Sequence, residues 1–301
     1  MTKQYKVLIL GYGEMGHAME YLLRNRHQLY IWDKYPQNDF NSVSLEDAAP
    51  KADIVLFCLP VNPHQEIAEH ISPLLKPHCL CLSIAKGLNQ AGLTAAQIFT
   101  DEFANKQAFG LIYGPMISEE ILNGHYAFAQ VACSKKDDFA RVKNLFEHSN
   151  LLIESSEDIS GITWSVILKN VYALAFGMAD ELQLGDNVRG FLTVSAIREL
   201  DQIISKMGGA SGSPYHLAGL GDLVTTGTSK TSHHYGLGRK LARGELQGIE
   251  GEGINTLNMV EKYHLIDRAV YPLFNLMHHI VTNPQDVEEQ FDAFLKQGHD
   301  T

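Results

Sequence analysis

The sequence of 301 residues predicts an α/β protein, in which a doubly wound sheet is followed by an all-helical second half. Up to about residue 155, short apolar runs of four to six residues alternate with helical periodicity. This alternation is typical of parallel strands that are covered by helices on both faces. From about Asp158 the strand signal vanishes, and long helical periodicity broken by glycine turns replaces it. We therefore predict a sheet domain over residues 1–155 and a helical domain over residues 156–301.

The elements of the first half follow from these apolar runs. Strands are predicted over 5–10, 28–32, 54–59, 79–83 and 108–112, and two further runs at 127–132 and 151–154 extend the sheet. Periodicity predicts the helices between the strands over 14–25, 64–75 and 91–104.

The second half contains no run with strand character. Its helices are predicted over 159–181, 187–207, 214–221, 232–243, 253–264 and 270–282. A short amphipathic helix is expected after Pro284, before a polar end.

Composition and charge limit the classes of function. With 45% hydrophobic and 20% charged residues, the chain can bury a sizeable core. Its net charge of -11 argues against a nucleic-acid or anionic membrane partner, so an anionic substrate would need a local positive pocket. No uncharged apolar run reaches the ~18 residues of a membrane span, and no leader segment precedes the first strand. We expect neither a membrane span nor a secretion signal.

The four cysteines occur in apolar, strand-like runs and lack the spacing of metal ligands. They are Cys58, Cys79, Cys81 and Cys133. We interpret them as reduced core residues, which indicates a cytoplasmic protein, and we expect no metal site.

The strongest cofactor signal is the glycine turn Gly11-Tyr12-Gly13-Glu14-Met15-Gly16, which follows a predicted strand and opens a predicted helix. Gly11 allows the tight turn, Gly13 lets the backbone approach a pyrophosphate, and Gly16 lets the helix pack on the strand. Glu14 and Met15 begin the helix, whose N-terminus offers free N–H groups to the pyrophosphate. The sequence therefore predicts a Rossmann-type dinucleotide-binding domain, although a glycine turn that binds nothing is the alternative.

The end of the second strand indicates which dinucleotide binds. Asp33 lies 22 residues after Gly11, where a carboxylate accepts the ribose hydroxyls of NAD and repels the 2′-phosphate of NADP. The neighbouring Lys34 could instead pair with a 2′-phosphate. We predict NAD as the cofactor with NADP as an alternative, and Asp33 could also be a plain turn residue.

A candidate acid–base group lies in the first long helix of the second half. Lys169 is surrounded by apolar residues on almost every side of this helix, so its ammonium group would be buried. Hydride transfer to a carbonyl leaves an alkoxide that needs a proton, and a lysine whose pKa is lowered by burial can donate it. The alternative is a salt-bridged structural lysine.

Three loop positions could complete the site. Lys86 and Gly114 follow sheet strands, and ligands bind at the carboxyl edge of such sheets. Asp222 lies in an apolar glycine loop, where its carboxylate could hold a substrate hydroxyl or the lysine ammonium. The alternative is an exposed loop lysine for Lys86, a plain β–α turn for Gly114 and a helix N-cap for Asp222.

The segment from Thr225 to His234 is dense in hydroxyl groups and other hydrogen-bond donors, including Ser232, His233 and His234. These groups could surround a phosphate, or the segment could be a solvated loop. No carboxylate has convincing spacing to the two histidines, so we do not expect them to bind a metal.

Taken together, these motifs resemble those of the bacterial NAD(P)-dependent sn-glycerol-3-phosphate dehydrogenases. The resemblance spans nearly the whole chain and rests on Gly11 to Gly16, Lys86-Gly87, Gly114-Pro115, Leu168-Lys169-Asn170-Val171, Gly219-Leu220-Gly221-Asp222-Leu223 and Glu252-Gly253-Ile254-Asn255-Thr256. It implies reversible reduction of dihydroxyacetone phosphate to glycerol 3-phosphate for phospholipid synthesis.

The resemblance also implies residue roles. Lys169 would be the proton donor and acceptor. Positions in contact with the substrate would be Lys86, Gly114, Met116, Asp222, Ser232, His233 and His234. Positions in contact with the cofactor would include Lys86, Ser118 and Glu252. Apart from the resemblance, the all-helical second half suggests a homodimer, because exposed helical domains often dimerise.

Three departures from the family pattern bear on the substrate. The family usually has Ser-Arg-Asn where this chain has Ser232-His233-His234, a serine where it has Val61, and a small hydroxyl residue where it has Met116. If a histidine replaces the arginine, phosphate binding would rest partly on imidazolium charge and would weaken as pH rises through ~6.5. Lys230 or Arg239 could compensate.

Two other functions therefore stay open at this point. One is a reductase of another small keto or hydroxy acid, similar to ketopantoate reductases or hydroxyacid dehydrogenases. The other is a non-catalytic NAD(H)-binding sensor. Retention of Lys169 and Asp222 favours an enzyme, because a sensor needs neither.

Overall fold

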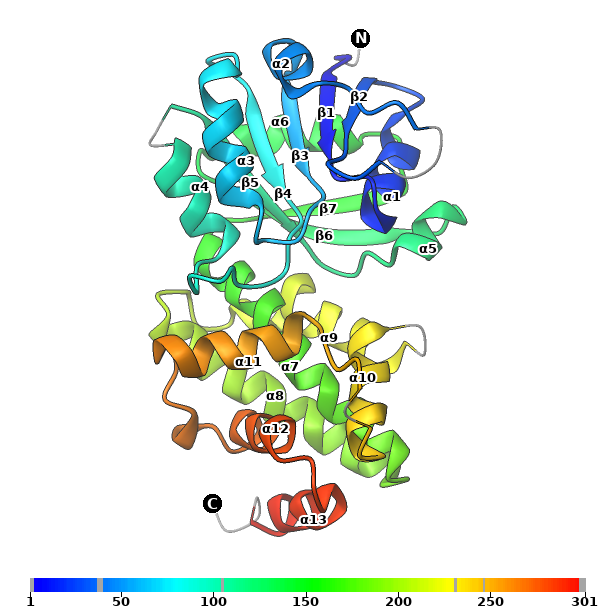
Figure 1. The fold of residues 1–301 in the computed structure, drawn as a ribbon, viewed down its shortest axis with the longest axis vertical. Helices are drawn as coiled ribbons and strands as arrows, with labels where there is room; N and C mark the ends of the chain where they lie inside the picture. The colour runs from blue at the N-terminus through cyan, green and yellow to red at the C-terminus, as the bar shows by residue number, and fades with distance from the viewer. Residues whose placement is uncertain (1–2, 37–39, 104–105, 230–231, 246, 298–301) are drawn as a thin grey trace.

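The computed structural model describes residues 3–36, 40–103, 106–229, 232–245 and 247–297. A sheet flanked by helices forms one half of the molecule, and helices alone form the other (Figure 1). Lys230, considered above as a phosphate ligand, lies outside the described residues.

The sheet has seven strands in the order β2-β1-β3-β4-β5-β6-β7. They are β1 Lys6–Leu10, β2 Gln28–Trp32, β3 Ile54–Phe57, β4 Leu80–Ser83, β5 Ala108–Tyr113, β6 Ala127–Cys133 and β7 Leu151–Ser156. All neighbouring strands are parallel except β5 and β6. The prediction of a parallel sheet missed this pair, because the chain between β5 and β6 forms only a short helix and does not cross the sheet.

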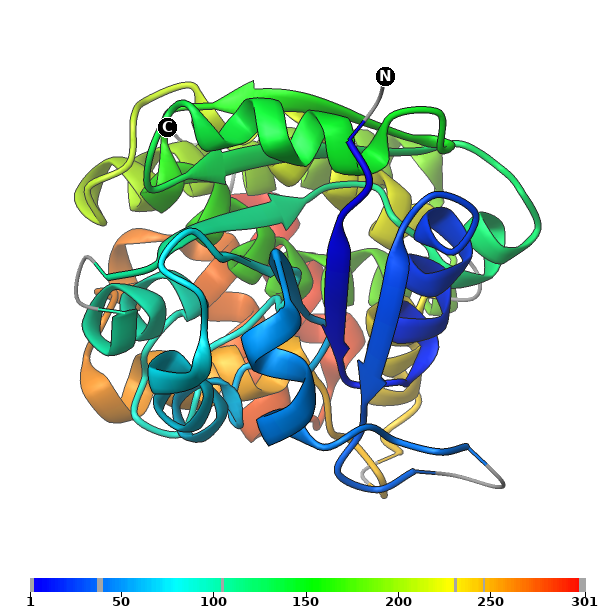
Figure 2. The same cartoon turned by 90° about the horizontal axis from the view of Figure 1, so that it is seen from above.

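Helices cover both faces of the sheet (Figure 2). They are α1 Glu14–Leu23, α2 Leu45–Ala48, α3 His64–Ile71, α4 Ala95–Phe103, α5 Ser118–Leu122 and α6 Asp138–Phe146. Alternate residues of β1 belong to separate core clusters, with Leu8 and Leu10 in one and Val7 and Ile9 in the other. This alternation places one cluster on each face of the sheet, so β1 is buried on both sides.

The helical half is built around α7, Ile159–Glu181, whose residues from Gly161 to Ala179 are all buried. The other helices are α8 Gly185–Lys206, α9 Asp222–Thr228, α10 His233–Ala242, α11 Glu252–Tyr263, α12 Pro272–Thr282 and α13 Val287–Gln297. By length and composition α7 could cross a membrane, but 89% of its apolar window is buried inside the protein, as in the core helix of a folded domain. It is the one helix of the described chain that passes this test.

Two features of the fold position the site. The carboxyl ends of the parallel strands face the helical half (Figure 1). The sheet ends at Ser156 and α7 begins at Ile159, so the two halves meet directly at this point. The division into two domains near residue 155 stays a prediction.

Candidate active site

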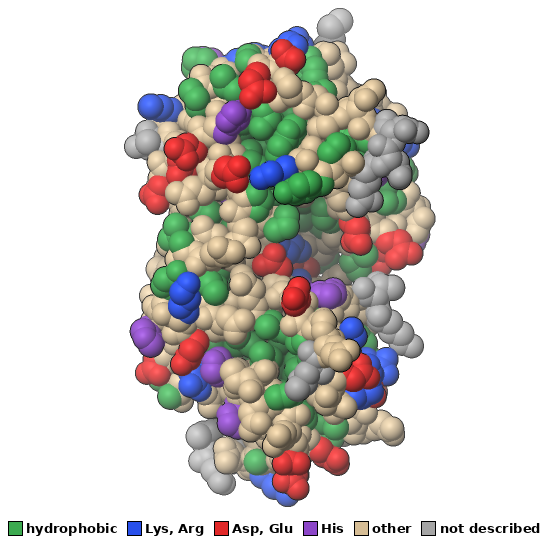
Figure 3. Space-filling view, in the orientation of Figure 1, with side chains coloured by type: hydrophobic (Ala, Val, Ile, Leu, Met, Phe, Trp, Pro, Cys, Tyr) green, Lys and Arg blue, Asp and Glu red, His purple; other side chains and the backbone are tan. Residues whose placement is uncertain are grey.

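A cavity of about 330 Å³ lies between the sheet half and the helical half. The space-filling view shows a hollow at this level, with acidic and basic side chains inside it (Figure 3). Its lining combines two residues that open α1, five that follow sheet strands and nine from the helical half. They are Glu14, Met15, Ile84, Lys86, Met116, Ile117, Ser118, Lys169, Asn170, Asp222, Thr225, Thr226, Ser229, Ser232, His234 and Glu252.

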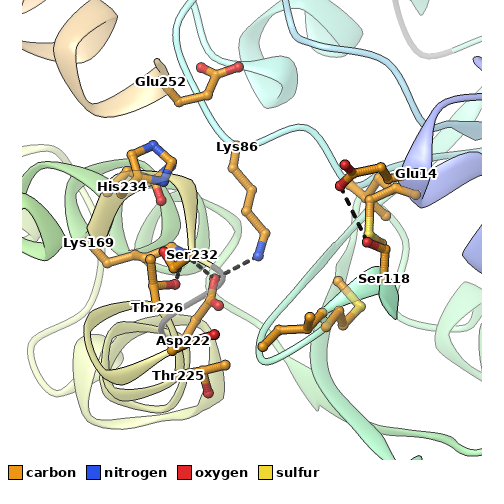
Figure 4. Close-up of a pocket in the computed structure, with 16 residues that line it drawn as sticks. Glu14, Lys86, Ser118, Lys169, Asp222, Thr225, Thr226, Ser232, His234 and Glu252 are labelled. Atoms are coloured by element: carbon orange, nitrogen blue, oxygen red, sulfur yellow. Dashed lines mark hydrogen bonds and ion pairs between the residues drawn. The ribbon is translucent and has the colours of Figure 1, made fainter. Parts of the chain in front are cut away.

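Two lysines share one carboxylate at the centre of the cavity (Figure 4). Oδ2 of Asp222 lies 2.7 Å from Nζ of Lys86 and 3.1 Å from Nζ of Lys169. Lys169 also donates to the hydroxyl of Thr226, and Lys86 donates to the carbonyl of Gly114 at 3.2 Å. Gly114 therefore positions Lys86 through its backbone and is not among the lining residues.

Each member of this cluster comes from a different element. Lys169 projects from the buried helix α7, and Lys86 follows β4 by three residues. Asp222 is the first residue of α9, after a π-helical turn over Leu217–Gly221. That turn requires a glycine at position 219, where a Cβ atom would lie 2.2 Å from the carbonyl oxygen of Pro214.

The protonation states of the cluster follow from burial and charge. Burial lowers the pKa of Lys169 to about 8, opposed by Asp222 and assisted by Lys86. Burial alone would raise the pKa of Asp222, but the two lysines outweigh it and hold this pKa below its usual value. Near neutral pH Lys169 is thus an ammonium group and Asp222 a carboxylate, and Lys169 loses its proton at a moderately alkaline pH.

The structure separates the two adjacent histidines. The ring of His234 lines the cavity, and its Nε2 lies 3.3 Å from the backbone nitrogen of Gly253, whose N–H it accepts. The ring proton is therefore on Nδ1, which makes the neutral ring a donor. Burial, followed by the charge of Lys169, lowers the pKa of His234 to about 3, so the imidazole stays neutral at physiological pH.

His233, which was expected in the substrate site, is not among the residues that line the cavity. Its ring is exposed, and its Nε2 donates to the carbonyl oxygen of Glu250 at 2.8 Å. Successive residues of a helix point about 100° apart, so only one of the two rings can enter the cavity. Arg239, the other candidate for compensation, is exposed and pairs with Glu181 at 2.6 Å. Neither Arg239 nor any other arginine is among the lining residues.

The first turn of α10 presents polar groups to the same cavity. Ser232 is the N-cap of this helix and accepts from the backbone of Tyr235 at 3.4 Å. The preceding backbone N–H groups have no partner within the helix, and the positive end of the helix dipole lies there. Together with Thr225 on α9, this turn can accept an anionic group.

The glycine turn has the geometry of a dinucleotide site. Gly11 has a φ of +91°, and a Cβ atom at Gly16 would lie 2.2 Å from the carbonyl oxygen of Gly11. A Cβ atom at Gly13 would meet nothing within 4 Å, so the backbone is open to an approaching ligand there. These three observations fit the expected roles of a tight turn, close helix packing and access for a pyrophosphate.

A second cavity of about 1160 Å³ adjoins this turn. It is lined by Gly13, Asp33 and eleven other residues, among them Glu14, Ile117 and Ser118, which also line the first cavity. The carboxylate of Asp33 accepts from the backbone N–H groups of Tyr12 at 2.7 Å and Tyr35 at 2.8 Å. These bonds fix the carboxylate at the cavity and leave acceptor capacity for ribose hydroxyls.

Neither Lys34 nor Glu252 lines the cavity that contains Asp33. Nζ of Lys34 lies 3.6 Å from Glu66. Glu252 begins α11 and packs on Gly87, where an added Cβ atom would lie 1.9 Å from its Oε2. Burial raises the pKa of Glu252 to about 7, so this carboxyl group is partly protonated near neutral pH.

One contact of the cluster was missed by the sequence reasoning. Thr226 is the hydroxyl partner of Lys169, but the sequence predicted it only as part of the polar segment from Thr225 to His234. Its spacing of four residues from Asp222 puts both side chains on one face of α9, which is a signal the sequence did contain. Among the described residues, no group of three or more His, Cys, Asp and Glu side chains is arranged to hold a metal.

Comparisons with known proteins find the same family in both halves of the chain. The model of the NAD-dependent glycerol-3-phosphate dehydrogenase N-terminus matches residues 34–139, and the model of the C-terminus of the same family matches residues 158–292. Among curated relatives, the glycerol-3-phosphate dehydrogenase [NAD(P)+] of Saccharophagus degradans is 28% identical, over 98% of this chain and 91% of that protein. The protein of the same name from Synechocystis sp. is 27% identical, over 97% and 94%.

Solved structures share the fold. The glycerol-3-phosphate dehydrogenase of Coxiella burnetii superposes with a TM-score of 0.85 at 21% identity, covering 97% of this chain and 99% of that one. A PanE/ApbA family ketopantoate reductase from Ralstonia eutropha has a TM-score of 0.57 at 17% identity, covering 95% and 99%.

Proposed function

The chain belongs to the NAD-dependent glycerol-3-phosphate dehydrogenase family, and on this premise we propose that it reversibly reduces dihydroxyacetone phosphate to sn-glycerol 3-phosphate with NAD(P)H. The observation that carries this proposal is the buried cluster of Lys169, Asp222 and Lys86, which lies where the dinucleotide cleft opens into the helical half. A lysine with a lowered pKa beside such a cleft suits proton transfer coupled to hydride transfer.

The residues of the cleft fit a dinucleotide. The open backbone at Gly13 and the free N–H groups at the start of α1 would hold the pyrophosphate, and Asp33 would hold the adenosine ribose. Ser118 and Glu252 lie further along, at the cavity that contains Lys169. The nicotinamide supplies or accepts the hydride when it is bound. NAD is favoured over NADP, because Asp33 repels a 2′-phosphate and Lys34 already faces Glu66.

Lys169 handles the proton in this proposal. In the direction of reduction, its ammonium group donates to the oxygen of the former carbonyl, and in the reverse direction its neutral amine accepts that proton. Asp222 holds both lysines in place and keeps each ammonium group paired. Lys86 is only partly buried, and its ammonium group can hold the substrate oxygen close to Lys169.

The phosphate would occupy the first turn of α10. The backbone N–H groups, the hydroxyl of Ser232 and the Nδ1–H of His234 are donors there. Because His234 is neutral, this end of the cavity relies on hydrogen bonds and on the helix dipole where the family usually has an arginine. Met116, at the wall of the cavity, contributes no polar group.

The two other functions are less well supported. The curated relatives carry the name glycerol-3-phosphate dehydrogenase [NAD(P)+], and their sequences align with nearly the whole chain. The ketopantoate reductase shares only the fold. A sensor without catalysis would not need a buried lysine and a second, partly buried lysine on one buried carboxylate, an arrangement that costs desolvation energy. A cytoplasmic location agrees with four free cysteines, and a homodimer stays a prediction that sedimentation would test.

The decisive experiment is oxidation of NADH with dihydroxyacetone phosphate, run beside a panel of unphosphorylated keto acids and beside NADPH. We expect turnover with dihydroxyacetone phosphate, together with a preference for NADH. Turnover of a keto acid without any turnover of dihydroxyacetone phosphate would overturn the proposed substrate.

A further inference from the structure

Glu14 places a carboxylate at the start of α1, on the wall of the cofactor cleft. It is the first residue of this helix and directly follows Gly13, where the backbone is open to a ligand. The hydroxyl of Ser118, at the start of α5, donates to Oε2 of Glu14 at 3.4 Å (Figure 4). This contact joins two segments that are 104 residues apart in the sequence.

A dinucleotide must pass this contact. Glu14, Ile117 and Ser118 are the three residues that line both cavities, the one containing Asp33 and the one containing Lys169. A cofactor whose ribose meets Asp33 and whose nicotinamide reaches Lys169 therefore crosses the line between Glu14 and Ser118. The part of the cofactor at the N-terminus of α1 is its pyrophosphate, which carries two negative charges.

Among the residues that the structure describes, no cation pairs with Glu14. Within the described chain, no ion pair joins its carboxylate to a lysine, arginine or histidine. The two lysines of the neighbouring cavity are already paired with Asp222. The carboxylate therefore repels an approaching pyrophosphate, and water and salt weaken this repulsion.

We propose that Glu14, held across the cleft by Ser118, opposes the pyrophosphate of the cofactor and so lowers the affinity of this chain for every form of the dinucleotide. This inference rests on the proposed function, because it requires a dinucleotide in the cleft. Asp33 sets the ratio of NADH to NADPH affinity, whereas Glu14 weakens both equally, since both cofactors carry the same pyrophosphate.

The size of the effect follows from Coulomb's law. A carboxylate about 5 Å from one phosphate charge in water-like surroundings weakens binding about 4-fold, and two such charges give about 15-fold in the absence of salt. At ~0.1 M salt the Debye length is ~10 Å, so part of this repulsion remains. We expect Glu14→Gln to tighten NADH and NADPH binding by about 3- to 15-fold.

The test is a fluorescence titration of NADH and NADPH with the full chain, with ADP as a competitor that shares the pyrophosphate. Glu14→Gln removes the charge and keeps the size of the side chain. The matched control is Glu288→Gln, because Glu288 is also an exposed acidic residue in the first turn of a helix, α13, away from the cleft. Both variants lose the same favourable interaction with a helix dipole, so comparable melting temperatures would show that folding is not the cause of a difference.

The expected result is tighter binding of NADH, NADPH and ADP in Glu14→Gln and no change in Glu288→Gln. The gain should shrink as salt is added, because screening already weakens the repulsion in the unmodified chain. Ser118→Ala alone should tighten cofactor binding by part of the same factor, because the hydroxyl holds the carboxylate in the cleft. Ser118→Ala added to Glu14→Gln should tighten binding no further, because no carboxylate is left to hold. Equal or weaker NADH affinity in Glu14→Gln would overturn the inference, whereas failure of the unmodified chain to bind any dinucleotide would overturn the proposed function.

Discussion

Lys169 should give the two directions of the reaction opposite dependences on pH. Burial lowers its pKa to about 8, so its ammonium form prevails below that pH and its neutral amine prevails above it. Reduction of dihydroxyacetone phosphate needs the ammonium form, and kcat/KM for reduction should be level near pH 7 and fall about tenfold per pH unit above pH 8. Oxidation of glycerol 3-phosphate needs the neutral amine, so its kcat/KM should rise over the same range. The phosphate of the substrate titrates near ~6 and does not disturb this window.

Lys169→Met tests the same group by removal. Methionine fills the buried space, and Asp222 keeps its ion pair with Lys86 at 2.7 Å, so the cavity should persist. Loss of a general acid should lower kcat by roughly 10²–10⁴ in both directions, with little change in the NADH dissociation constant. Lys143→Met, an exposed change on α6, is the control. If turnover of Lys169→Met stays within a few-fold of the unmodified chain, or if its pH profile is unchanged, another group handles the proton, and Lys86 is the next candidate.

Four further outcomes are expected. Gly13→Asp puts a negative side chain into open space, so the protein should fold normally while NADH binding, followed by fluorescence, falls below detection. Asp33→Ala should weaken NADH more than NADPH in the same titration, and an unchanged ratio would mean that Asp33 does not bind the ribose. His233→Arg should leave the pH profile of KM for dihydroxyacetone phosphate parallel to that of the unmodified chain, because His233 faces away from the cavity; a flatter profile would place it at the phosphate. Glu199→Ala should lower the free energy of unfolding by about 2–3 kcal/mol in a urea titration, because the buried carboxylate accepts from two backbone N–H groups of α12 and from a tyrosine, and a loss below ~1 kcal/mol would contradict this.

Much of the fold could be predicted from the sequence. All seven strands and the long helices were expected close to their observed positions, because apolar runs and helical periodicity are local patterns. The helices α2, α5, α6 and α9 were missed, and the stretch predicted as a helix over 214–221 forms a 3-10 turn and a π-helical turn instead. The reversal between β5 and β6 was also missed, because the direction of a strand depends on how its connection packs.

The sequence by itself determined which chemical groups this protein has. It contained the glycine turn, the carboxylate of Asp33 and the lone lysine on an apolar helix, because each of these depends on a few neighbouring residues. Only the tertiary structure decided which groups meet. It joined Lys86, Lys169 and Asp222, which are far apart in the chain, turned His234 inward and His233 outward, and set Glu14 across the cleft from Ser118. These outcomes depend on how the helices pack against the sheet and on the burial that this packing creates, and no local pattern in a sequence records them.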